Sequence, residues 1–345
     1  MAAIATASTV AARRTPRRTV IVVVVLAVLV LLVAMAGVAI GAYTLSPSEL
    51  LRTLFGQGAP GDTFVVWRLR LPRVVLGALV GAAFAVSGAL FQSLLRNPLA
   101  SPDIIGVSGG ASVAAVFGIL VLGVSGPAIS IAAFVGAVVV ASVIYLLAWR
   151  GGVTGFRFVL IGVGVAFMAN AVLGYLITRG AVNDVSDALV WMVGGLGAAS
   201  PDTNLVLAIA LAVLLPGVAI LAPRLRMLQL GDEAAGGLGV RVERSRLTLI
   251  LMAVVLVAVA TAFAGPIAFV AFVSAPIARR MLATGGLALV PSALVGMLLV
   301  LASDLVAQHL LPGAGQVPVG IVTGIIGAPY LLWLLATTNR EGKGA

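Results

Sequence analysis

The sequence predicts an all-α polytopic membrane protein with about ten transmembrane helices. Of its 345 residues, 61% are hydrophobic and only 9% are charged, whereas about 25% of the residues in a soluble domain are charged. Runs of about twenty apolar residues recur along the whole chain, and each is long enough to cross a ~30 Å hydrocarbon core. Lysines and arginines gather in alternate connections between these runs, which is typical of a membrane protein with a fixed orientation.

The first apolar run follows a basic tail at residues 1–19 and extends from Val20 to about Gly41. It resembles a secretory signal peptide, and Ala34-Met35-Ala36 is similar to a cleavage site. Because the run continues beyond that site to the length of a full span, we expect it to remain as the first helix. The other nine spans are predicted at residues 74–95, 104–123, 127–148, 158–178, 203–222, 247–264, 266–282, 287–308 and 317–336. Residues 20–336 then form one transmembrane domain, followed by a tail at 337–345.

Several prolines fall within or beside the predicted spans. Pro266 and Pro276 lie in the eighth span, and Pro318 and Pro329 lie in the tenth. Proline removes a helical hydrogen bond, and a broken helix is tolerated in a membrane only where protein or an aqueous cavity satisfies the freed backbone groups. Broken helices around a cavity are typical of transporters.

Pairs of glycines spaced four residues apart predict close packing of helices. Gly77 with Gly81, and Gly320 with Gly324, place two small residues on one face of a helix. Such faces allow helix backbones to approach each other in lipid.

The distribution of basic residues predicts the orientation. With the N-terminus inside, sixteen of the 21 lysines and arginines lie on the cytoplasmic side and five, at positions 52, 68, 70, 73 and 179, lie outside. This asymmetry satisfies the positive-inside rule, so we expect both termini in the cytoplasm. The net charge of +10 therefore indicates membrane orientation rather than binding of nucleic acid.

Three connections are longer than simple turns. Residues 43–73 and 179–202 are predicted outside, and both carry short apolar patches that indicate interfacial helices. Residues 224–246 are predicted inside and form the most charged stretch of the chain.

The sequence also limits the energy source. Ion-coupled transport usually needs an ionisable group buried in the membrane, and of the eleven acidic residues only Asp304 lies inside a predicted span, near its outer end. The chain has no phosphate-binding G-x-x-x-x-G-K-[ST] motif, so it is not predicted to hydrolyse ATP. We therefore expect energy to come from another subunit that docks at residues 231–240. The alternative for this segment is an ordinary solvated loop.

Ordered motifs along the chain resemble the FecCD family, the permease subunits of binding-protein-dependent ABC importers for iron-siderophores, haem and cobalamin. The motifs are Arg70-Leu71-Pro72-Arg73, Ser87-Gly88-Ala89-Leu90-Phe91-Gln92, Arg96-Asn97-Pro98-Leu99-Ala100-Ser101-Pro102, Gly106-Val107-Ser108, residues 231–240, residues 269–279, and Pro318-Val319-Gly320-Ile321-Val322-Thr323 with Gly327-Ala328-Pro329. The resemblance implies a type II ABC importer permease with ten helices. It pairs with a second copy or a close homologue, above two cytoplasmic ATPase subunits and beneath one substrate-binding protein.

The resemblance also assigns the candidate site residues. It implies that Arg70 and Arg73, with Arg68, bind carboxylates of the binding protein; the alternative is that these arginines snorkel at the membrane edge. It places Asn97, Leu99 and Thr154 at the cytoplasmic gate. The residues expected to contact the ATPase are Gly231, Asp232, Glu233, Ala234, Leu238 and Gly239.

The expected function is transport of a metal chelate, with a ferric siderophore as the first choice and haem or cobalamin as the alternative. An ion-coupled secondary transporter is the alternative from another class. The chain is not expected to be an enzyme or to bind a metal or cofactor, since ATP and Mg²⁺ would bind to the partner ATPase. Family members often carry an arginine near the end of the ninth helix, where this chain has Gln308.

Overall fold

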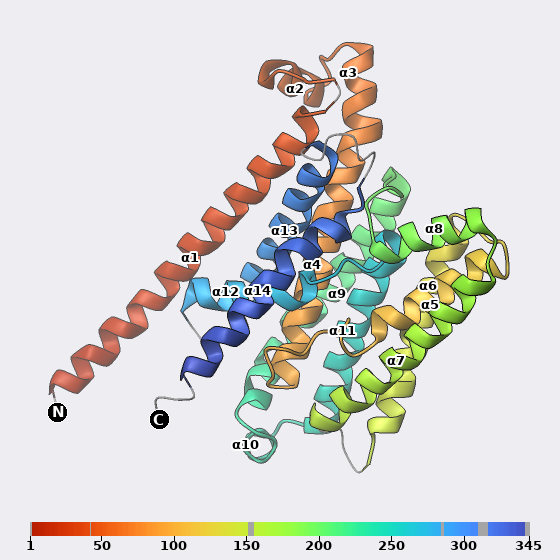
Figure 1. Ribbon diagram of the computed structural model, residues 1–345. Helices are drawn as coiled ribbons and strands as arrows, with labels where there is room; N and C mark the ends of the chain where they lie inside the picture. The colour runs from red at the N-terminus through yellow and green to blue at the C-terminus, as the bar shows by residue number, and fades with distance from the viewer. Residues whose placement is uncertain (1, 42, 151–154, 284–285, 310–316, 342–345) are drawn as a thin grey trace.

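The computed structural model describes residues 2–41, 43–150, 155–283, 286–309 and 317–341, and these residues form helices and connections without strands (Figure 1). The helices are α1 (Ala2–Ala39), α2 (Pro47–Leu54), α3 (Pro60–Phe64), the π-helix η1 (Val65–Arg70), α4 (Leu71–Leu94), α5 (Val107–Leu120), α6 (Pro127–Ala148), α7 (Gly155–Arg179), α8 (Val182–Val193), α9 (Pro201–Gln229), α10 (Asp232–Gly237), α11 (Val242–Ala264), α12 (Val270–Leu282), α13 (Leu289–His309) and α14 (Val319–Glu341).

The all-α transmembrane fold is confirmed. Each of the ten predicted spans has a corresponding helix: α1, α4, α5, α6, α7, α9, α11, α12, α13 and α14. Seven helices among the described residues are long and apolar enough to cross a membrane, and α5 and the stretch Val319–Leu334 of α14 are shorter apolar helices. The predicted tail at residues 1–19 is helical from Ala2 onwards, as part of α1.

The two ends of the bundle carry different short elements. In Figure 1, α1 begins and α14 ends at the same end of the molecule as α10, and α2 and α3 lie at the opposite end. We call these the α10 end and the α2 end. The short helices expected in residues 43–73 and 179–202 are present as α2, α3 and α8.

The helix α4 is the centre of the bundle. Its residues are buried without interruption from Val80 to Ser93, and its polar contacts include bonds to α11 and α12. Ser87 Oγ donates to the carbonyl of Ala253 in α11 (2.7 Å), and Gln92 Nε2 donates to that of Phe272 in α12 (2.9 Å). Hydrogen bonds in an apolar interior have no water to replace them, so they fix α4 relative to the helices around it.

The first glycine pair packs as expected, and the second does so only in part. A Cβ added at Gly81 would collide with the backbone of Gly296 in α13, and one at Gly77 would meet Leu196 and Leu301. In α14 a Cβ at Gly320 would collide with the carbonyl of Val193, but a Cβ at Gly324 would meet nothing within 4 Å. Within this chain, only Gly320 of the second pair packs against another segment.

The eighth span begins later than predicted. The helix α12 starts at Val270 rather than at 266 and has 13 residues, which at ~1.5 Å per residue is about 20 Å. Pro266 lies in a non-helical stretch in which Gly265 (φ 67°) and Phe269 (φ 66°) have left-handed backbones. Pro276 and Pro329 are instead accommodated inside continuous helices.

Backbone contacts stabilise the non-helical stretch between α11 and α12. Gly195 N donates to the carbonyl of Ala264 (2.7 Å), and Gly320 N donates to that of Gly194 (3.1 Å). A Cβ at Gly194 would collide with the carbonyl of Pro266. The end of α11, the connection from α8 to α9 and the start of α14 therefore meet through their backbones.

Candidate docking, gating and coupling sites

The basic turn at the α2 end holds Arg70 within the chain. Its guanidinium donates to the carbonyls of Val38 (2.9 Å) and Ala39 (3.0 Å) at the end of α1, and to that of Tyr43 just beyond it. The last carbonyls of a helix have no partner within the helix and carry a partial negative charge. Arg70 therefore caps α1 in this structure.

Arg73 is also paired within the chain. Its guanidinium makes a two-pronged contact with Asp304 of α13, with N–O distances of 2.9 and 3.1 Å. Asp304 is 4% exposed, and Gln308, one turn further along α13, donates to it as well. The carboxylate therefore neutralises Arg73, and Gln308 occupies a remaining acceptor position.

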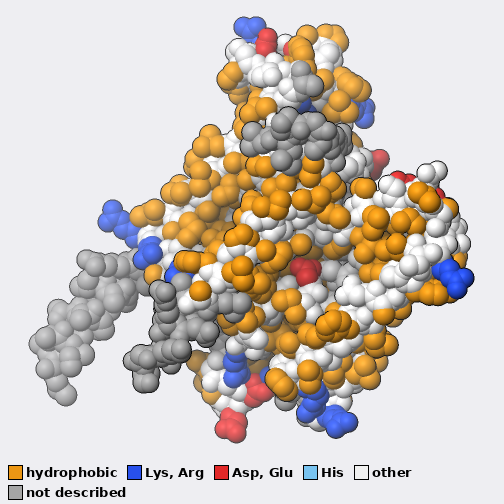
Figure 2. Space-filling model, in the orientation of Figure 1, with side chains coloured by type: hydrophobic (Ala, Val, Ile, Leu, Met, Phe, Trp, Pro, Cys, Tyr) orange, Lys and Arg blue, Asp and Glu red, His pale blue; other side chains and the backbone are white. Residues whose placement is uncertain are grey.

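Arg68 differs from the other two arginines, because its side chain is exposed. It makes no hydrogen bond or ion pair that involves the described part of the chain. The surrounding surface is apolar: Phe55 is 80% exposed, Phe64 58% and Trp67 45%. Figure 2 shows hydrophobic and basic side chains together on the projection formed by α2, α3 and η1, which we call the α2 knob.

The gate turn, residues 95–100, ends α4 at the other end of the molecule. Asn97 N donates to the carbonyl of Gln92 (3.1 Å), and Arg96 between them has a left-handed backbone (φ 49°); together these features are a Schellman ending of a helix. The side chain of Asn97 accepts from Leu99 N (2.9 Å). Thr154, the third predicted gate residue, lies outside the described residues.

The coupling segment, residues 231–240, is a short helix between two glycines. Gly231 (φ 120°) precedes α10 and Gly239 (φ 82°) follows it, and Ala235 is buried against the bundle. Glu233, Ala234 and Leu238 are exposed.

Asp232, in contrast, is paired within the chain. Its carboxylate accepts two hydrogen bonds from Arg246 of α11 (2.7 and 2.8 Å) and one from Arg96 of the gate turn (3.2 Å). The residues predicted to contact the ATPase therefore differ, because Asp232, although about half exposed, is paired with arginines of this chain. Arg246 was not among the predicted site residues, because basic residues are expected in such a loop for orientation alone.

A cavity of about 250 Å³ brings the gate turn and the coupling segment together. It is lined by Leu94, Leu95, Arg96, Gly155, Phe156, Asp232, Arg246 and Ile250. The end of α4, the start of α7 and α10 therefore share one small space, although they are far apart in the sequence.

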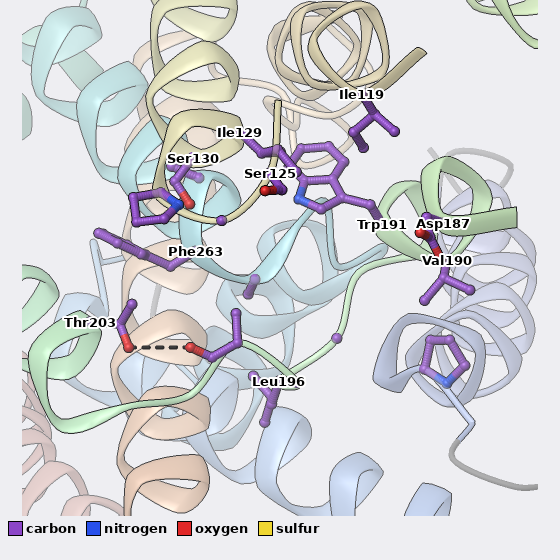
Figure 3. A pocket seen from close by; sticks show the side chains of 18 of the residues that line it. Ile119, Ser125, Ile129, Ser130, Asp187, Val190, Trp191, Leu196, Thr203 and Phe263 are labelled. Atoms are coloured by element: carbon purple, nitrogen blue, oxygen red, sulfur yellow. Dashed lines mark hydrogen bonds between the residues drawn. The ribbon is translucent and has the colours of Figure 1, made fainter. Parts of the chain in front are cut away.

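A larger cavity of about 770 Å³ lies among the helix ends around α8 (Figure 3). Its walls include Trp191 of α8, Phe263 of α11 and Ile129 of α6, and Arg73 is the one cationic residue among the described residues that line it. Asp184 and Asp187 of α8 also line the cavity, so its wall is mainly apolar with two carboxylates and scattered hydroxyl and backbone groups. An apolar wall with a few polar groups is typical of a ligand-binding cavity.

The comparison with protein families is decisive. The FecCD transport family matches residues 20–337, which include all ten spans. The chain belongs to this family.

Relatives and solved structures agree with this assignment. FecCD-family relatives include the ferric enterobactin transport system permease protein FepG of Escherichia coli K12, at 41% identity over 94% of this chain and 98% of FepG. The achromobactin transport system permease protein CbrC of Dickeya dadantii 3937 is 40% identical over 88% of each chain. A solved inward-facing structure of a metal-chelate type ABC transporter has a TM-score of 0.82 and 25% identity, covering 91% of this chain and 98% of its own.

Proposed function

We propose that this FecCD-family chain is the transmembrane permease of a binding-protein-dependent ABC importer that carries a ferric siderophore across the cytoplasmic membrane. The observation that carries the proposal is the family match over residues 20–337, together with 41% identity to a ferric enterobactin permease over almost its full length. The same proposal assigns ATP hydrolysis to a separate subunit and makes this chain non-catalytic.

The state of Asp304 argues against the ion-coupled alternative. Proton or sodium coupling needs a membrane carboxylate that binds and releases the ion during transport. Asp304 is the one acidic residue inside a predicted span, and it is held by Arg73 at 2.9 Å and by Gln308. A carboxylate neutralised in this way has a structural role, which supports an energy source outside this chain.

The length of the central helical run supports a docking site beyond the membrane. The run from Pro60 to Leu94 has 35 residues, about 52 Å at ~1.5 Å per residue, whereas the hydrocarbon core is ~30 Å thick. With the α10 end in the cytoplasm, as the basic residues predict, the α2 knob extends outside. Exposed aromatic side chains there need a protein partner rather than lipid.

Arg68 and the aromatic residues of the α2 knob are therefore the first contacts that we propose for the substrate-binding protein. Arg70 and Arg73 stay in the docking proposal as a second step, because each would have to exchange a bond within the chain for a carboxylate of the partner. Arg73 would exchange one carboxylate for another and leave Asp304 with Gln308, whereas Arg70 would exchange the backbone carbonyls at the end of α1 for a carboxylate. Both exchanges break bonds within the chain, so they follow the first contact rather than replace it.

The coupling segment, with Glu233 and Leu238 exposed, is proposed to bind the ATPase. The complete transporter would contain two permeases, either identical or closely related, two ATPase subunits and one binding protein. ATP and Mg²⁺ would bind between the ATPase subunits, and the energy of hydrolysis would reach this chain through α10.

Growth of a deletion strain tests the cargo. The strain would be supplied in turn with ferric enterobactin, a ferric hydroxamate, ferric citrate, haem and cobalamin as the required nutrient. We expect growth to fail on at least one ferric siderophore and to return with the plasmid-borne gene. Failure confined to haem or to cobalamin would replace the siderophore with that cargo and leave the permease assignment intact.

A further inference from the structure

We propose that Arg96 is a positioning residue that connects the coupling segment to the gate turn, so that displacement of α10 by the ATPase moves the end of α4. The inference rests on the proposed function. It assigns Asp232 to this internal connection and leaves the contact with the ATPase to the exposed residues of α10.

The backbone at Arg96 is the first observation. Arg96 follows Leu95, the C-cap residue of α4, with φ 49°, and Asn97 N closes the Schellman turn on the carbonyl of Gln92. Glycine is the usual residue at this position, because a side chain strains a left-handed backbone. An arginine here is unfavourable for the turn itself, so its side chain requires another explanation.

The contacts of the Arg96 guanidinium supply that explanation. It donates to the carbonyl of Leu228 at the end of α9 (2.6 Å) and to Asp232 at the start of α10 (3.2 Å). These two residues lie on either side of Gly231, whose φ of 120° is accessible mainly to glycine. One side chain of the gate turn therefore binds both sides of the bend that carries α10.

Asp232 is shared between a fixed partner and a displaceable one. Arg246 is 12% exposed and pairs with Asp232 at 2.7 Å, and it also binds Glu243 of its own helix. Arg96 is 46% exposed and pairs at 3.2 Å. Because Arg246 belongs to the packed helix α11 and Arg96 to a turn, displacement of α10 would draw Arg96 and its turn along before it moved α11.

The stability of the fold does not account for the ion pair between Arg96 and Asp232. An ion pair with both partners about half exposed contributes little to folding, because water and salt screen it. The neighbouring cavity also leaves room for movement, since its lining includes Arg96 and Asp232 together with Gly155 at the start of α7. The connection is thus placed to transmit movement between the coupling segment and the gate.

The test is Arg96→Gly in the complete transporter, reconstituted in proteoliposomes with its ATPase and binding protein. Glycine suits the left-handed turn and offsets the lost bond to Leu228, so we expect a Tm close to the wild-type value and unchanged co-purification of the ATPase. The amount of chelate imported per ATP hydrolysed should fall at least about tenfold, within the usual range of coupling between sites. Arg96→Lys should restore part of this ratio, because lysine also carries a positive charge to Asp232.

Two further variants complete the experiment. Asp232→Ala removes the same contact from the side of α10. The double variant Arg96→Gly with Asp232→Ala should import no less chelate per ATP hydrolysed than either single variant. Arg244→Gln, which removes an exposed positive charge nearby, should keep the wild-type ratio. A wild-type ratio in both Arg96→Gly and Asp232→Ala would overturn the inference. Absence of ATP-dependent uptake by the wild-type assembly would instead contradict the proposed function and, with it, this inference.

Discussion

Arg73 of α4 and Asp304 of α13 form an ion pair, with an N–O distance of 2.9 Å and side-chain exposures of 18% and 6%. The pair is 231 positions apart in the sequence and lies beside the larger cavity. It affects both stability and docking, because the same arginine is a candidate contact for the binding protein.

We expect Asp304→Asn to destabilise the protein by about 2–3 kcal/mol. This is at the low end of the usual cost of removing one partner of a buried ion pair, because Arg73 remains partly exposed. The charge of Arg73 would remain without its partner in a low-dielectric environment. Thermal unfolding in detergent measures the change. Combining Arg73→Gln with Asp304→Asn should recover much of the loss, and a double variant as unstable as Asp304→Asn would contradict the pairing.

Arg68 and Arg70 should respond differently to the same substitution. Arg68→Glu should weaken binding of the substrate-binding protein without changing Tm, because Arg68 is exposed. Arg70→Glu should lower stability by about 1–3 kcal/mol, because two carbonyls at the end of α1 and one just beyond it lose a charged donor. Titration of the binding protein against the purified permease, together with Tm, separates the effects. An equal loss of binding with equal Tm for both variants would count against this division of roles.

Gly81 should tolerate no larger residue. A methyl group at this position collides with the backbone of Gly296, so Gly81→Ala forces α4 and α13 apart and should cost about 1–3 kcal/mol. Gly324→Ala is the matched control, because a Cβ there meets nothing within 4 Å. The two variants would be compared by yield of monodisperse protein and by Tm, and a stable Gly81→Ala would show that the helices are less closely packed than described.

The α2 knob should loosen at acidic pH. The pKa of Glu49 is lowered by hydrogen bonds from the side chain and backbone of Ser46 at the start of α2. A lowered pKa in the folded state stabilises the fold above the unfolded pKa, near ~4.3, and this contribution is lost as the pH falls through the folded value. The protection of α2 amides, corrected for the intrinsic pH dependence of hydrogen exchange, should therefore fall at the acidic end, and Glu49→Gln should remove this change in protection.

The ten-helix architecture is predictable because each span is a local feature, a long apolar run that must satisfy its own backbone in lipid. The start of α12 is not local. Its non-helical stretch around Pro266 depends on the backbones of Gly194 and Gly320, which are distant in the sequence. A proline shows where a helix can break, and the tertiary contacts decide whether it does.

The candidate sites also combine features that are local in the sequence with contacts between distant residues. Motifs identify Arg70, Arg73 and Asp232 as functional candidates, but their partners within the chain come from other helices. Arg96 and Asp232 are 136 positions apart, and no pattern in one sequence connects them. Only the left-handed backbone of Arg96, at a position that favours glycine, distinguishes it from an ordinary orientation charge.

The most direct test of the account is uptake of a radiolabelled ferric siderophore into proteoliposomes that contain this permease with its ATPase and binding protein. We predict accumulation that requires internal ATP, stops with vanadate and is unaffected when ionophores collapse proton and sodium gradients. Accumulation that persists with vanadate and disappears when an ion gradient is collapsed would contradict the account.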